Sequence, residues 1–232
     1  LPGDLRADVH DQVLATTIRL SRETQDADAW RSYTRAFIAE FAARGGDEYE
    51  ATVRSFAASD NPDIAWRARR ALAARGLVDA GAIEAWRSAD GSGEAARMSV
   101  EALASLPIEE ARRHAWESVY SETLSNDFLT ATLAGLQASS WEGEPGIEAA
   151  VDRLRSYWES HTIGMALRYA NGVLAYGLDI DRDGSVSRSV GLLRSWLDTN
   201  SDAPAQLRRI VIEHLDAFER DERVQRRWKQ DQ

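Results

Sequence analysis

The sequence contains no cysteine, and this absence excludes several kinds of site at once. Disulfide bonds, cysteine-ligated zinc and thiol catalysis all require a thiol. The absence is compatible with a reducing compartment, and we expect a cytoplasmic protein. Because the sequence begins with Leu1 rather than Met, we also expect its natural N-terminus to lie further upstream.

Lysine is almost as scarce, since Lys229 is the only one in 232 residues. The other basic residues are arginines, which alternate with acids rather than gathering in one stripe. The formal net charge of −10 disfavours a nucleic-acid groove or an anionic membrane surface. Long apolar runs are absent too, because none approaches the roughly 18 residues of a membrane-spanning helix. We therefore predict no nucleic-acid partner and no membrane partner.

Patterns typical of β-strands are nearly absent, whereas helical patterns recur throughout. We find no sustained alternation of apolar and polar residues. Asp90-Gly91 and Asp183-Gly184 lie between helical patterns rather than between β-branched runs. The clearest helical pattern lies near the C-terminal end, where the spacing predicts a single buried face. Its members are Leu207, Ile210, Val211, Leu215 and Phe218.

The helical patterns are separated by short linkers, most of which contain glycine or proline. Asn61 and Pro62, for example, are a typical cap and first residue of a helix, and Gly76 is a typical stop. The predicted helices span residues 7–24, 27–44, 47–59, 62–75, 79–88, 93–106, 108–120, 126–139, 146–160, 162–176, 186–198 and 204–229. Short connections favour antiparallel neighbours. We therefore predict one all-α domain over residues 1–232, an α-solenoid of antiparallel helix pairs of the HEAT or armadillo kind.

Four segments carry a family resemblance through their order and spacing. They are Arg69–Gly76 followed by Ala82–Glu84, Pro107–Trp116, Leu124–Asp127 followed by Leu133–Leu136, and Ala203–Val211. Together they resemble the helical C-terminal domain of a bacterial, actinobacterial-like aminopeptidase N, a zinc metallopeptidase of the membrane alanyl aminopeptidase family. The resemblance covers about residues 60–232, whereas residues 1–60 match the family only in helical pattern.

The resemblance implies a function that depends on domains outside this sequence. In the family, other domains carry the substrate-amine site and the His-Glu-x-x-His zinc helix, and the helical domain closes over the active site. This sequence has neither His-Glu-x-x-His nor the Gly-x-Met-Glu-Asn substrate motif. The resemblance thus implies a non-catalytic domain that shapes the substrate chamber of a zinc aminopeptidase, which removes N-terminal residues from peptides. Its implied partners are peptide substrates and the zinc-holding catalytic domain of the same polypeptide.

A free-standing HEAT-like scaffold that binds a partner protein on its concave face is the alternative hypothesis. The coding region separates the two. An upstream extension into His-Glu-x-x-His favours the aminopeptidase domain, and a start codon just before Leu1 favours the scaffold. A third hypothesis, an independent helical enzyme, has no motif in its favour.

No catalytic residue, cofactor site or metal site is predicted within this sequence. Neither a Gly-x-Ser-x-Gly elbow nor a phosphate-binding loop is present. The histidines are His10, His114, His161 and His214, and none lies three or four residues from another, as a helical zinc site requires. We interpret each as a surface or half-buried helix residue. The tryptophans are Trp30, Trp66, Trp86, Trp116, Trp141, Trp158, Trp196 and Trp228. We interpret them as residues that bridge packed helices rather than as a binding stripe.

One predicted interhelix loop imitates a calcium site. Asp179, Asp181 and Asp183, with Gly184 after them, reproduce the opening of an EF-hand loop. The last position of such a loop supplies a bidentate glutamate, but here it is Val190. We favour a glycine-turned, aspartate-capped loop over a calcium site, and the sequence leaves calcium binding open.

Overall fold

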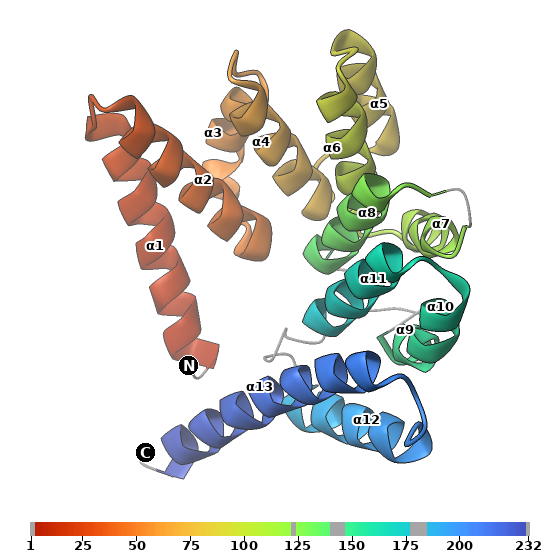
Figure 1. The fold of residues 1–232 in the computed structure, drawn as a ribbon. Coiled ribbons are helices and arrows are strands. Elements are labelled where there is room, and N and C mark those ends of the chain that lie inside the picture. The colour runs from red at the N-terminus through yellow and green to blue at the C-terminus, as the bar shows by residue number, and fades with distance from the viewer. Residues whose placement is uncertain (1–2, 122–123, 140–146, 177–184, 231–232) are drawn as a thin grey trace. The chain divides into compact units, whose positions relative to one another are not determined.

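The computed structural model describes residues 3–121, 124–139, 147–176 and 185–230, and every regular element in these ranges is an α-helix (Figure 1). The predicted all-α class is therefore confirmed for the described residues, which form thirteen helices. They are α1 (Gly3–Glu23), α2 (Ala27–Arg44), α3 (Asp47–Ala57), α4 (Pro62–Ala74), α5 (Ala80–Ala89), α6 (Gly93–Ala104), α7 (Glu109–Val119), α8 (Asn126–Ala138), α9 (Ile147–Asp152), α10 (Leu154–Ser160), α11 (Ile163–Tyr176), α12 (Ser185–Thr199) and α13 (Ala205–Gln230). Within these ranges, no helix combines the length and the apolar character needed to cross a membrane.

The ends of α4 follow from local sequence chemistry. The Asn61 side chain accepts a hydrogen bond from the Ile64 amide, and Pro62 occupies the first turn. At the other end, Gly76 has φ +68°, a left-handed conformation that glycine adopts without strain. The amide of Leu77 then donates to the carbonyl of Leu72 at 2.9 Å, which satisfies an otherwise unpaired helix-end acceptor. Both predicted signals are confirmed.

The prediction of one helix over residues 146–160 was wrong, because the chain forms α9 and α10 with a break at Arg153. The Arg153 amide donates to the carbonyl of Ala150 at 3.2 Å, three residues back instead of the four of an α-helix. Its backbone angles, φ −87° and ψ −4°, lie in the sparsely populated bridge region. Neither glycine nor proline marks this break, so the helical pattern did not indicate it.

The chain divides into two compact units, which we describe separately. The N-terminal unit comprises Asp4–Ala115 and Ala134–Trp141, and the C-terminal unit comprises Leu1–Gly3, Trp116–Leu133 and Glu142–Gln232. Each unit consists of residues that pack closely with one another. Whether residues 1–232 form a single domain stays a prediction.

In the N-terminal unit, α1, α2, α3 and α4 share one apolar core. Its buried members are Leu14, Ile18, Phe37, Ile38, Phe41, Val53, Ala57, Ile64, Ala68, Ala71 and Leu72. Helix α4 contacts α2, α3 and α6, and α5 lies beside α6 (Figure 1). Trp66 is buried against Met98 of α6, and Trp30 packs on the edge of Phe56. For these two tryptophans the packing interpretation is confirmed.

In the C-terminal unit, α13 packs on α12 and α11, and α10 packs on α11 (Figure 1). The five apolar residues of α13 that were predicted to form one face are all buried. Trp196 of α12 is buried as well, whereas Trp141 lies outside the described residues. The helical periodicity therefore identified the buried face of α13 correctly.

Candidate functional site

Three of the four histidines line no candidate site. His10 of α1 pairs with Glu40 of α2, and His114 is exposed on α7. His214 lies beside the ring of Phe218, and burial lowers the pKa of its imidazole. In the part of the chain that the structure describes, His, Asp and Glu side chains form no group of three that could hold a metal ion.

The fourth histidine, His161, lines a small pocket in the C-terminal unit, which we call the aromatic pocket. Its cavity volume is about 220 Å³. Its lining residues are Tyr120, Arg153, Ser156, Tyr157, Ser160 and His161. This pocket combines a cation, hydroxyl groups and aromatic rings, and is the candidate site.

Helix α10 supplies most of the pocket because of its residue spacing. Arg153 precedes the helix, Ser156 and Tyr157 lie three and four positions further on, and Ser160 and His161 follow after another turn. Residues three or four apart share one face of a helix. One face of a short helix thus presents the guanidinium, the hydroxyls, a phenol and the imidazole together.

The ring of Tyr157 is the middle layer of an aromatic stack. The His161 ring lies parallel to it with centroids 3.8 Å apart, and the Tyr169 ring of α11 stacks on it at 4.0 Å. Both faces of the Tyr157 ring are therefore covered. Tyr120 meets Tyr169 edge-on at 6.2 Å and is itself stacked against Trp116. Such ring pairs add stability beyond the area that they bury, so this wall of the pocket is firmly held.

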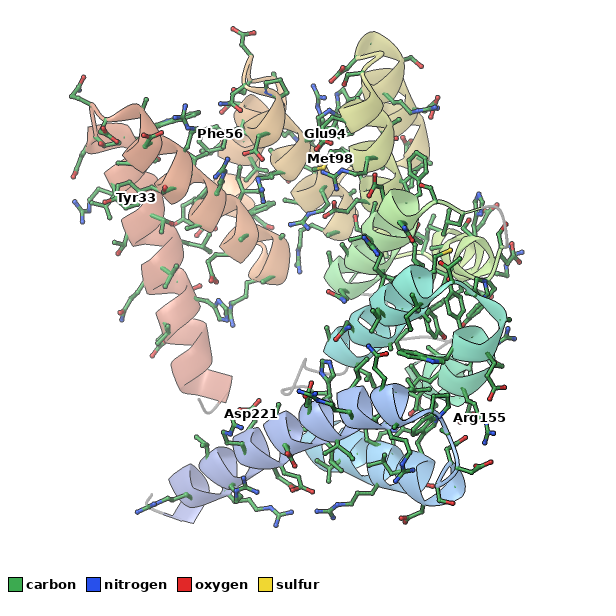
Figure 2. All side chains as sticks on the ribbon, in the orientation of Figure 1. Tyr33, Phe56, Glu94, Met98, Arg155 and Asp221 are labelled. Carbon is green, nitrogen blue, oxygen red and sulfur yellow. The ribbon has the colours of Figure 1, made fainter. Side chains whose placement is uncertain are left out.

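Arg153 brings to the pocket a positive charge that no acidic side chain in the described part of the chain neutralises. Its guanidinium carbon lies 4.2 Å from the centroid of the Tyr120 ring, within the range of a cation–π contact. Among the described residues, Arg153 forms no ion pair. Arg155, which is labelled in Figure 2, differs. Its guanidinium donates to both Glu159 and Asp202. The two arginines are near neighbours in sequence, but within the ranges that the structure describes only Arg155 is paired with carboxylates.

Hydrogen bonding within the pocket is incomplete. The Tyr169 hydroxyl donates to the Ala150 carbonyl at 2.8 Å, and the Ser160 hydroxyl donates to the Ser156 carbonyl at 2.7 Å. The buried Tyr157 hydroxyl and the buried Nε2 atom of His161 have no hydrogen-bond partner among the described residues. A buried polar atom without a partner costs about 1–3 kcal/mol. Two such atoms beside one cavity indicate a place where a polar ligand would be stabilised.

The phenols of this cluster are protonated near neutral pH. Burial, together with the nearby Tyr120, raises the pKa of Tyr157 to about 12. Burial also raises the pKa values of Tyr120 and Tyr169. The Tyr157 hydroxyl is therefore a neutral group that can donate a hydrogen bond. Beside a guanidinium that forms no ion pair with any described residue, this hydroxyl is suited to binding an anion.

Sequence reasoning named only one residue of this pocket, His161, and interpreted it as a helix residue. The spacing of Arg153, Tyr157 and His161 on one helix face was the available signal. Tyr120 and Tyr169 come from other segments, and a single sequence does not indicate that they meet here. Of the calcium-like loop, Asp179, Asp181, Asp183 and Gly184 lie outside the described residues.

Comparison with known proteins assigns this chain to no family. No protein-family model matches the sequence, and no curated protein matches it either. The resemblance to aminopeptidase N therefore stays a prediction from the sequence.

Proposed function

We propose that this chain is the helical C-terminal domain of an aminopeptidase N-type zinc metallopeptidase, in which it covers the active site and shapes the peptide chamber. The observation that supports this most is the position of the segments that resemble the family. Their buried apolar members include Ala71, Leu72, Ala73, Ala74, Ile83, Ala115, Trp116, Leu133, Leu136, Ala203, Leu207, Ile210 and Val211. These residues pack helices rather than perform chemistry, as expected of a supporting domain.

We also propose that the helices continue the pattern of an α-solenoid. In such a stack, each helix packs on its hairpin partner and on the equivalent helix of the next pair. In the N-terminal unit α4 contacts α3 and also α2 and α6, and in the C-terminal unit α13 contacts α12 and also α11. Contacts between alternate helices support this arrangement. A solenoid offers a concave surface that can cover a cleft on a neighbouring domain.

Zinc in this proposal belongs to the catalytic domain of the same polypeptide. The described histidines and acids of this chain do not fit a zinc site, because no three of them gather. This chain contributes the shape of the peptide chamber and a negative charge. Its net charge of −10 favours the positively charged amino end of a peptide substrate.

The coding region gives the first test. An upstream extension that encodes His-Glu-x-x-His supports the proposal, and a start codon immediately before Leu1 favours the HEAT-like scaffold instead. The second test compares the full-length protein with a truncation lacking residues 1–232, at matched zinc occupancy. We expect the truncation to lose peptide cleavage and length selection more than it loses zinc.

Two outcomes contradict the proposal. A truncated enzyme that stays folded and keeps its rates and length preference on peptides would make the helical domain a stabilising appendage only. One tightly held zinc per chain in the isolated 232-residue protein, with chelator-sensitive hydrolysis of aminoacyl anilides, would make this chain catalytic by itself.

A further inference from the structure

We propose that the aromatic pocket binds the carboxylate of a small organic acid, with Arg153 as the charged partner and the Tyr157 hydroxyl as the second donor. This inference is independent of the aminopeptidase proposal, because it rests on the C-terminal unit alone. Three features carry it: a guanidinium without an ion pair and a buried phenol without a hydrogen-bond partner, both as judged among the described residues, and a cavity of limited size.

The guanidinium of Arg153 is the first feature. Arg155 shows how an arginine of this segment is normally satisfied, since it donates to both carboxylate oxygens of Asp202 at 2.8 and 3.1 Å. Arg153 has no such carboxylate among the described residues. Its contact with the Tyr120 ring holds the guanidinium at the pocket. A ligand carboxylate would provide the two-oxygen partner that the planar guanidinium matches.

The Tyr157 hydroxyl is the second feature. Tyr157 is 3% exposed, and its hydroxyl has no partner in the described part of the chain. A buried hydroxyl without a partner lowers the stability of the folded protein, and a phenylalanine at this position would avoid that cost. A hydroxyl that binds a ligand gives the tyrosine a role that phenylalanine could not fill. Its ring is fixed between His161 and Tyr169, so the position of the hydroxyl is defined before a ligand binds. A carboxylate oxygen accepts the hydrogen bond that the folded chain leaves unmade.

The size and lining of the cavity are the third feature. A volume of about 220 Å³ is smaller than the roughly 300–1,000 Å³ of pockets for drug-sized ligands. The lining includes the aromatic residues Tyr120, Tyr157 and His161. Because both faces of the Tyr157 ring are covered by His161 and Tyr169, this ring can meet a ligand ring only with its edge. Aromatic walls favour a planar ring on the ligand. The chemistry therefore points to a carboxylate carried by a single ring, and benzoate is a suitable probe.

Calorimetric titration of the 232-residue protein tests the proposal with three probes at constant ionic strength. Benzoate is expected to bind with a Kd on the order of 1 mM. Benzamide has the same ring without the charge, and inorganic phosphate has charge without the ring. We expect both to bind at least about tenfold more weakly than benzoate.

Three variants assign the binding to this pocket. Arg153→Gln should weaken benzoate binding about tenfold or more, because a charge-assisted hydrogen bond is lost. Tyr157→Phe should weaken it about three- to tenfold, because it removes one hydroxyl. Arg155→Gln is the matched control, since Arg155 is two positions away, carries the same charge and does not line the pocket. It should leave benzoate affinity unchanged within about twofold.

Several results would overturn the proposal. They are the absence of any binding heat with benzoate up to about 20 mM, equal affinity for benzamide or phosphate, and equal losses in Arg153→Gln and Arg155→Gln. Circular dichroism establishes that each variant is folded. If Arg153→Gln does not fold, Arg153→Lys replaces it, because lysine keeps the charge and loses the two-pronged donor. Unchanged benzoate affinity in Arg153→Lys would then contradict guanidinium recognition.

Discussion

Gly135 of α8 lies directly against the backbone carbonyl of Glu101 in α6. A Cβ added at Gly135 would be 2.3 Å from that oxygen and 2.6 Å from the Cβ of Ala104. Real atoms do not approach this closely, and a helix backbone cannot turn aside as a long side chain can. Within the N-terminal unit, α6 and α8 therefore reach this separation because residue 135 has no side chain.

Replacement of Gly135 by alanine should therefore be destabilising, although alanine favours helices more than glycine does. We expect the free energy of unfolding to fall by about 3 kcal/mol, at the upper end of the usual cost of overpacking. Urea unfolding monitored by circular dichroism measures the change.

Gly191 of α12 is the matched control for this substitution. It is also a helical glycine, but a Cβ there would have no described atom within 4 Å. Gly191→Ala should therefore raise the free energy of unfolding by about 0.5–1 kcal/mol, because alanine is the better helix former. Similar changes in the two variants would contradict the steric account of Gly135.

Local features of the fold could be predicted from the sequence, because their causes lie within a few residues. The cap at Asn61 and the stop at Gly76 depend on side-chain and backbone preferences of single residues. The buried face of α13 follows from helical periodicity, which needs only the spacing of Leu207, Ile210 and their successors.

Features that depend on contacts between distant residues could not be predicted. Nothing near Gly135 in the sequence indicates that Glu101 lies against it. The break at Arg153 involves a residue that fits a continuous helix by propensity. The aromatic pocket requires Tyr120 and Tyr169, which are 49 positions apart, to meet the face of α10. A single sequence contains the residues of this site but not their proximity.

Arg69 of α4 lies between two tryptophans, and its planar shape should matter as much as its charge. Its guanidinium carbon is 4.8 Å from the Trp66 ring centroid and 5.3 Å from that of Trp86. Its Nε atom also donates to the Ala57 carbonyl at 3.0 Å. Arg69→Lys keeps the charge but loses the flat guanidinium, so we expect a loss of about 1–2 kcal/mol in unfolding free energy.

Arg87→Lys provides the comparison for Arg69→Lys. Arg87 pairs with Glu84 on the exposed side of α5, where a lysine can serve equally well. We expect a change below about 0.5 kcal/mol by the same urea measurement. If both substitutions have the same effect, the position between the tryptophans contributes nothing specific.

Calcium should leave the melting temperature unchanged. Val190, at the position where an EF-hand loop supplies its bidentate glutamate, is 3% exposed in α12 and packs in the C-terminal unit. It provides no oxygen ligand. We expect about 5 mM calcium to shift the melting temperature by no more than about one degree relative to a chelator-treated sample. A clear rise that Asp181→Ala and Asp183→Ala abolish would establish a metal site in this loop.

Ionisation of Tyr157 should lower the free energy of unfolding at alkaline pH. Burial raises its pKa from 10.0 to about 12, so the folded state holds the phenolic proton more tightly than the unfolded state. The associated stability is complete below the unfolded pKa near 10.0 and decreases as the pH rises towards about 12. At about pH 11 the loss from this group should be on the order of 1 kcal/mol.

Tyr157→Phe removes this titrating group and retains the ring that His161 and Tyr169 sandwich. Between about pH 8 and about pH 11, the unfolding free energy of the variant should fall by about 1 kcal/mol less than that of the wild type. Near neutral pH the variant should be as stable as the wild type or more stable by up to about 1 kcal/mol, because a buried unpartnered hydroxyl is gone. Urea unfolding of both proteins at the two pH values provides the comparison. Equal alkaline losses would mean that the Tyr157 hydroxyl is better solvated than its burial indicates, and a marked loss of stability near neutral pH would mean that it has a partner within the folded chain.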